Sequence, residues 1–341
     1  MAKQWLFWFK ELGKEHNNVV GRKCANLGEL TRIGLPVPPG FALSVEAYNR
    51  FFSETNAEQE IREYIAQYVR KFPSLSEWTT VSNDIRHLVE SKYMPKDMAG
   101  AITSHYDELS RKSDTVKMAV SVRSAGPVSH PGQYETYLNV KGGTDLIEKV
   151  IKVWSSSFNP RSLVYRARKG LPLESDPIGV GILGMINARA AGVALTADPN
   201  TGDHSKIVCE ANWGLGESVV SGRMIPDFFL LDKESLEILI KRLGQKEMCI
   251  LCSETGVIEE EVPDERRSCF CLDDREVKEI ANYGKFIEEY FKGVPQDIEW
   301  AISDELQKGN NLFFLQARPA IIVEKKSATD TILDLIMSRK H

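Results

Sequence analysis

The hydrophobic pattern of this chain changes along its length. Residues 45–112 carry apolar side chains at spacings of three and four, which is typical of amphipathic helices. Apolar and polar residues begin to alternate at Met118–Arg123, which is typical of a strand. The later part of the chain has short apolar segments separated by Gly, Asn, Asp and Pro, which is also typical of strands. The pattern predicts a mixed α/β (α+β) fold. Its first part, 1–177, includes the helical insert 45–112, and its strand-rich second part is 178–322.

The same periodicities predict the individual elements. A short helix is expected from Asn26 to Gly34, and longer helices are expected over 146–168 and 274–291. The strands expected in the second part are 178–187, 191–197, 206–211, 227–232, 236–241, 296–302 and 311–317.

Composition narrows the class of protein. Hydrophobic residues make up 42% and charged residues 27% of the 341 residues, as in globular proteins, which excludes a disordered or collagen-like chain. The net charge of -5 argues against sequence-independent nucleic-acid binding, which needs a basic face. No apolar run reaches the roughly 18 residues of a membrane helix, and Trp5–Phe9 is shorter than a signal-peptide core. We therefore expect a cytoplasmic protein without nucleic-acid or membrane partners.

Four of the six cysteines lie close together in the sequence. Cys249 and Cys252 have the spacing of a zinc-binding pair, whereas Cys269 and Cys271 have a less usual one. The segment between the pairs, 255–267, indicates strand and turn. Buried or half-buried thiols are the favoured interpretation, with a zinc site as the alternative.

One glycine motif resembles a dinucleotide-binding fingerprint. Gly179–Gly184 matches G-x-G-x-x-G, but the fingerprint requires a strand before it and a helix after it. Apolar, strand-forming residues follow this motif, so it does not predict a nicotinamide or flavin site.

Three separate segments have the chemistry needed to hold a magnesium nucleotide. In Gly21–Lys23 a turn leads into a helix with a lysine at its entry, where it can meet phosphate oxygens. In the second segment, Arg123 ends a buried strand, and a buried guanidinium needs an anion. The loop that follows contains Gly132 and can fold over phosphates. A surface lysine and a structural ion pair are the alternative interpretations.

The third segment is a hairpin near the end of the chain. Alternation places Asp297 and Glu299 on one face of their strand, and Gln316 and Arg318 on one face of theirs. A loop centred near residue 307 sets Glu299 opposite Gln316 and Asp297 opposite Arg318. The carboxylate and amide oxygens suit Mg²⁺, and Arg318 can neutralise phosphate charge. An ordinary surface pair is the alternative.

Eight segments of the chain carry a family resemblance. They are Gly21–Leu30, Gly34–Phe41, Val120–Ser124, Gly132–Val140, Gly192–Pro199, Trp213–Glu217, Asp297–Ala301 and Leu315–Pro319. Together they resemble, in order and over about residues 5–322, the N-terminal nucleotide-binding domain of phosphoenolpyruvate synthase and pyruvate phosphate dikinase. The resemblance implies an ATP-grasp fold, with ATP and Mg²⁺ in a cleft between two lobes. It also implies a dikinase reaction, in which the β-phosphoryl group of ATP passes to a histidine and then to a small acceptor.

The resemblance also implies roles for particular residues. By position, it implies ATP contacts at Lys23, Arg123, Gly132, Thr136, Tyr137, Glu299, Gln316 and Arg318. Among these it implies catalytic roles for Arg123, Glu299 and Arg318, and Mg²⁺ ligands at Glu299 and Gln316. The chain departs from the family pattern at Arg22, where a glycine is usual, and at Leu183, where a glutamine is usual. Its loop at 124–131 is also shorter and lacks an acidic pair.

The accepting histidine is expected elsewhere. The family's Thr-Ser-His-Ala motif does not occur in these residues, and His130 is interpreted as a loop residue rather than an acceptor. Because full-length relatives continue beyond the position of Pro319, we expect a phosphohistidine domain on a separate subunit. The ATP-binding subunit of phenylphosphate synthase is similar in size and division, which implies a phenol-like acceptor on that partner.

Several alternatives stay open. The acceptor can be pyruvate, as in phosphoenolpyruvate synthase, or a drug, as in rifampicin phosphotransferase. Leu183 and the shortened loop also allow a non-catalytic ATP-sensing module. The tail 323–341 has an apolar stripe, Ile332, Leu335 and Ile336, that predicts a partner-docking helix, with a frayed end as the alternative.

Overall fold

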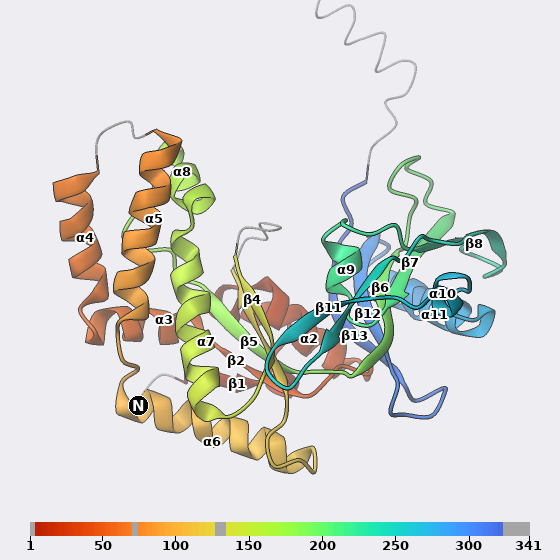
Figure 1. Ribbon diagram of the computed structural model, residues 1–341, viewed down its shortest axis with the longest axis horizontal. Coiled ribbons are helices and arrows are strands. Elements are labelled where there is room, and N and C mark those ends of the chain that lie inside the picture. Colours follow the sequence, from red (N-terminus) through yellow and green to blue (C-terminus); the bar gives the residue numbers. More distant parts are fainter. Residues whose placement is uncertain (1–3, 70–73, 127–133, 323–341) are drawn as a thin grey trace, which may run out of the picture. The chain divides into compact units, whose positions relative to one another are not determined.

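A computed structural model describes residues 4–69, 74–126 and 134–322 (Figure 1). The chain has a mixed α/β fold and divides into two compact units. Unit 1 comprises Met1–Asn187 and Cys252–Ile258, and unit 2 comprises Ala188–Leu251 and Glu259–His341. Among the described residues, no helix is both long and apolar enough to cross a membrane.

Unit 1 contains a five-stranded antiparallel sheet. Its strand order is β1-β2-β5-β3-β4. The strands are β1 (Leu6–Trp8), β2 (Gly40–Leu43), β3 (Val120–Ala125), β4 (Thr136–Val140) and β5 (Gly179–Gly184). Because β5 is hydrogen-bonded between β2 and β3, it belongs to unit 1. The units therefore divide after Asn187, later than the predicted boundary at residue 177.

Helices pack on this sheet and bury its core. The described residues of the segment with helical spacing, 45–112, form four helices, and the aromatic side chains of Tyr48, Phe51 and Trp154 are fully buried in the same core. The helices of unit 1 are η1 (Phe9–Glu11), η2 (Lys14–His16), α1 (Asn17–Val20), α2 (Arg22–Arg32), α3 (Val45–Glu54), α4 (Ala57–Tyr68), α5 (Leu75–Glu90), α6 (Lys96–Lys112), α7 (Gly143–Ser155), η3 (Ser156–Phe158) and α8 (Pro160–Lys169).

The predicted helix over 146–168 is interrupted. A 3-10 turn, η3, follows α7, and Asn159 then caps α8 by accepting a hydrogen bond from the Ser162 amide at 2.9 Å. Pro160 occupies the first position of α8, where its missing amide hydrogen costs nothing. The sequence pattern overlooked this break because the apolar spacing continues through it.

The described residues of unit 2 contain a six-stranded antiparallel sheet, and a two-stranded hairpin is divided between the units, because Cys252–Ile258 belongs to unit 1. The sheet order is β13-β12-β6-β7-β8-β9, and β10 pairs with β11. The strands are β6 (Ala188–Leu195), β7 (Lys206–Trp213), β8 (Asp227–Asp232), β9 (Ile238–Arg242), β10 (Met248–Cys252), β11 (Val257–Glu261), β12 (Gln296–Ser303) and β13 (Leu312–Pro319). The helices are α9 (Glu217–Val220), α10 (Asp264–Arg267) and α11 (Asp274–Tyr290).

Helix α11 covers one face of the six-stranded sheet. Its start is fixed by a capping box, in which Asp273 and Glu276 each accept a backbone hydrogen bond from the other at 2.9–3.0 Å. Gly284 allows a close approach, because a Cβ there would lie 3.3 Å from Thr196 and 3.7 Å from Ile298. The face of β12 that carries Ile298 is therefore the covered one.

Candidate nucleotide-binding site

The helix entry at Lys23 is built on a glycine. Gly21 has a φ of +81°, and a Cβ at this position would lie 1.9 Å from the carbonyl oxygen of Ala125 in β3. The Arg22 amide donates to the Gly126 carbonyl at 3.0 Å. These contacts hold the first turn of α2, with the half-buried Lys23, against the end of the strand that carries Arg123.

Arg123 and Thr136 share one face of the unit 1 sheet. In the register of β3, Arg123 lies opposite Thr136 on one side and Gly181 on the other. A Cβ on Gly181 would lie 2.9 Å from the Cys24 sulfur, so this face is the one that α2 covers. Three predicted contacts, Lys23, Arg123 and Thr136, therefore lie on the same side of the sheet.

The pKa of the Cys24 thiol depends on burial and on the charges around it. Burial raises its pKa to about 12, and the positive charges of Lys23 and Arg123 partly oppose that rise. Both cations therefore act on the same atom. Lys23 and Arg123 therefore both lie near Cys24, on the side of the sheet that α2 covers.

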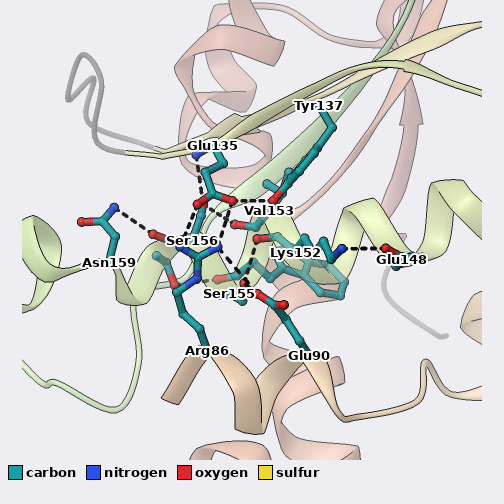
Figure 2. Close-up of polar contacts among 12 residues, drawn as sticks. Arg86, Glu90, Glu135, Tyr137, Glu148, Lys152, Val153, Ser155, Ser156 and Asn159 are labelled. Atoms are coloured by element: carbon teal, nitrogen blue, oxygen red, sulfur yellow. Dashed lines mark hydrogen bonds and ion pairs between the residues drawn. The ribbon is translucent and has the colours of Figure 1, made fainter. Parts of the chain in front are cut away.

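Tyr137 does not join this group. It lies opposite Val122, whose side chain is in the core, and adjacent residues of a strand point to opposite faces. Its hydroxyl group donates to the Glu135 carboxylate (Figure 2), and burial together with that carboxylate raises the pKa of the phenol. The resemblance placed Thr136 and Tyr137 in one set of contacts, and strand alternation separates their side chains.

Other predicted features of unit 1 lie in β5 or outside the described residues. The glycine motif Gly179–Gly184 forms β5 itself and continues into no helix, so it lacks the context of a dinucleotide fingerprint. Leu183 lies opposite Ser121, on the same face as Arg123, and is buried. Gly132 and His130 lie outside the described residues, as does the tail 323–341 of unit 2.

The predicted hairpin register in unit 2 is confirmed. Asp297 lies opposite Arg318, and Glu299 lies opposite Gln316. The four side chains therefore share one face, opposite the face that α11 covers. A bulge after Glu299 changes the register only beyond these pairs.

Arg318 is held by the carboxylate beside it. Its Nε and Nη2 atoms donate to Asp297 Oδ2 at 2.8 and 2.7 Å, and both side chains are partly buried. This ion pair fixes the plane of the guanidinium next to Glu299 and Gln316. Asp297 therefore orients Arg318, a role that the sequence pattern did not assign.

Sequence reasoning missed Glu210. It lies in β7 opposite Val193 of β6, and Val193 in turn lies opposite Glu299 of β12, so Glu210 and Glu299 share a face two strands apart. Burial raises the pKa of the Glu210 carboxyl. The signal was available in β7, where the buried Cys209 and Ala211 point to the other face. Placing Glu210 near Glu299 nevertheless required the strand order.

The residues of this face fit Mg²⁺. Glu299 offers a carboxylate and Gln316 an amide oxygen from adjacent strands, and Mg²⁺ prefers hard oxygen ligands from few protein groups plus phosphate and water. No group of three or more His, Cys, Asp or Glu residues suited to a metal occurs within 4–69, 74–126 and 134–322. A dedicated all-protein metal cage is therefore not formed by these residues.

The same result bears on the cysteines. Cys249, Cys252, Cys269 and Cys271 all lie in the described part of the chain, where they form no disulfide and no such group. Burial raises the pKa values of Cys249 and Cys271, as for inert interior thiols. The zinc alternative is not supported, and Cys269 is exposed rather than buried.

Comparison with known proteins shows the family of this chain. A family model described as the pyruvate phosphate dikinase AMP/ATP-binding domain matches residues 17–337. The chain belongs to this family. Its expected segments, from the Lys23 helix to the β12–β13 hairpin, all lie within the matched range.

Similar proteins carry the name phosphoenolpyruvate synthase. A probable phosphoenolpyruvate synthase of Methanocaldococcus jannaschii is 36% identical over 95% of this chain and 27% of the relative. One of Pyrococcus horikoshii is 34% identical over 97% of this chain and 45% of the relative. The phosphoenolpyruvate synthase of Pyrococcus furiosus is 33% identical, again over 97% and 45%. The chain thus spans less than half the length of these relatives, and a specific similarity to phenylphosphate synthase is not shown.

Proposed function

We propose that this chain is the ATP-binding, phosphoryl-donating part of an AMP-forming dikinase of the phosphoenolpyruvate synthase type. Its units would serve as the two lobes of an ATP-grasp fold that bind one MgATP. In the overall reaction, ATP, water and a histidine give phosphohistidine, AMP and inorganic phosphate. The observation that carries the proposal is the Asp297–Arg318 and Glu299–Gln316 register, which forms an oxygen-ligand and guanidinium face within a chain of this family.

The proposed roles follow from the chemistry of each group. Glu299 and Gln316 would hold Mg²⁺, which supplies charge neutralisation on the phosphate oxygens. Arg318, oriented by Asp297, would donate to a phosphate oxygen and stabilise charge on the group in transfer.

The unit 1 side supplies the other cations. Lys23 at the entry of α2 and Arg123 at the end of β3 would bind the phosphates of the same nucleotide. Thr136, opposite Arg123, offers a hydroxyl group on that face.

The accepting histidine and the final acceptor are parts of the same proposal. We place the histidine on a phosphohistidine domain outside these 341 residues. Pyruvate is favoured as the final acceptor because the similar proteins are named phosphoenolpyruvate synthase. A phenol-like acceptor and rifampicin are competing arms of the test. A cytoplasmic location fits an ATP-using chain whose six cysteines, all in the described part of the chain, form no disulfide.

The experiment has two stages. Calorimetry of the chain with MgATP tests binding, and chromatography then follows AMP formation after addition of a phosphohistidine-domain protein of this family with pyruvate, phenol or rifampicin. Binding, AMP formation and pyruvate-dependent turnover are expected. Binding without AMP under every condition would leave only an ATP-sensing module, and phenol-dependent turnover would restore the phenolic acceptor.

A further inference from the structure

A network of polar contacts joins the start of β4 to α5 and η3. Figure 2 shows Arg86, from α5, reaching Glu135, which immediately precedes β4. The contact is bidentate: Arg86 Nη1 lies 2.7 Å from Glu135 Oε1, and Nη2 donates to Oε2 at 2.9 Å. Two parallel hydrogen bonds fix both the distance and the plane of the carboxylate.

Glu135 is held by two further elements. Its backbone amide donates to Ser156 Oγ in η3 at 3.2 Å, and that hydroxyl group donates to the Val153 carbonyl at 2.7 Å. The hydroxyl group of Tyr137 donates to the same Glu135 carboxylate. The position of Glu135 is therefore set from α5, from η3 and from β4 itself.

The ion pair is partly shielded from water. Burial lowers the pKa of Arg86, but the hydrogen bond and charge of Glu135 outweigh that effect, and the net shift is upward. The side chain of Arg86 is only 25% exposed, and Glu90 lies 3.7 Å from its Nη2 atom. Ser155 donates to Glu90 at 2.6 Å and so fixes that second carboxylate. A half-buried bidentate pair holds its geometry more firmly than an exposed one.

Strand alternation connects this network to the opposite face. Glu135 and Tyr137 are fixed on the helix side, and Thr136, between them, lies opposite Arg123 on the α2 side. We infer that Arg86 is a positioning residue, which acts through Glu135 to set Thr136 beside Arg123. This inference rests on the proposed function, because it assumes that Thr136 and Arg123 bind the nucleotide.

The test compares MgATP affinities of the full chain by calorimetry. Arg86→Gln and Glu135→Gln are each expected to raise the Kd about tenfold, as loss of one charged hydrogen-bonding arrangement does. Arg86→Lys keeps the charge without the bidentate geometry, so its Kd should lie between the values for the unmodified chain and for Arg86→Gln. Arg62→Gln is the matched control, because Arg62 in α4 forms an exposed pair with Glu58 at 2.8 Å, and its Kd should match the unmodified chain.

A second background separates positioning from general stability. In a Thr136→Val chain, Arg86→Gln should change the Kd less than about twofold, since the group that it positions has lost its hydroxyl. A full tenfold effect in that background, or equal Kd values for Arg86→Gln and Arg62→Gln, overturns the inference and leaves the proposed function standing. If Arg86→Gln fails to fold, the Kd values of Glu135→Gln and Arg86→Lys, measured in the same two backgrounds, test the inference in its place. An unmodified chain that binds no MgATP overturns both proposals.

Discussion

At the scale of single residues, we expect substitutions on the face formed by β12 and β13 to weaken MgATP binding. Glu299 is paired with Gln316 and lies next to the ion pair of Arg318 with Asp297. Glu299→Gln removes the negative charge and replaces one carboxylate oxygen by an amide NH2 group, while the shape of the side chain is nearly kept.

We expect Glu299→Gln to weaken MgATP binding by about 10- to 100-fold, the usual range for losing a charged contact. Titration calorimetry with and without Mg²⁺ measures this. The difference in Kd between Glu299→Gln and the unmodified chain should shrink when Mg²⁺ is removed. Glu237→Gln, at an exposed position near β9, is the matched charge control. A Glu299→Gln chain with unchanged affinity contradicts the metal-ligand assignment.

Glu210 provides a pH-dependent prediction. Because burial raises its folded-state pKa above the unfolded value, the carboxyl group favours the folded state when protonated and disfavours it when ionised. Glu210→Gln should therefore raise the apparent Tm of the nucleotide-free chain at pH 7, by about 1–2 °C. The gain should vanish as the pH falls to the ordinary pKa of a glutamic acid. Thermal scans from pH 4 to 8 with Glu237→Gln as control measure this, and a gain independent of pH argues against the desolvation cause.

At the scale of elements, a buried ion pair joins three segments of unit 2. Lys246 Nζ lies 2.5 Å from Asp227 Oδ1 at the start of β8, and both side chains are fully buried. Asp227 also accepts from the amides of Gly244 and Cys271 at 2.8 Å each. The pair therefore ties β8 to the segments before β10 and before α11.

Removing one partner leaves a buried charge. Lys246→Met is expected to destabilise the chain by about 3–5 kcal/mol, whereas Arg223→Gln, which breaks the exposed pair with Glu259, should cost less than about 1 kcal/mol. Urea unfolding followed by circular dichroism makes the comparison. The double variant Lys246→Met/Asp227→Leu should recover part of the loss, and a double variant as unstable as the sum of its parts contradicts this account.

At the scale of the whole molecule, the proposal requires both units for one nucleotide. Lys23→Met in unit 1 and Glu299→Gln in unit 2 should each weaken MgATP binding at least about tenfold. AMP formation with a phosphohistidine-domain protein should fall with them, as measured by chromatography. Lys10→Met, at an exposed position near the first strand, controls for loss of positive charge. If either site variant binds and turns over ATP normally, the two sets of residues do not serve one triphosphate.

The amino-acid sequence by itself determined the features that depend on local periodicity. These include the helical segment 45–112, most strands of the second part, and the facing of Glu299 with Gln316, because a hairpin's register follows from the position of one short loop. The start of α2 near Lys23 could also be predicted from the sequence, because the turn and helix signals lie within a few residues of each other.

Only the tertiary structure decided which distant segments meet. The insertion of β5 between β2 and β3, the alignment of Glu210 with Glu299 across β6, and the contact of Arg86 with Glu135 all join residues far apart in the chain. Periodicity says which side of its own element a residue occupies. It carries no information on which other element lies there, because that choice is made by strand order and by burial of the whole core.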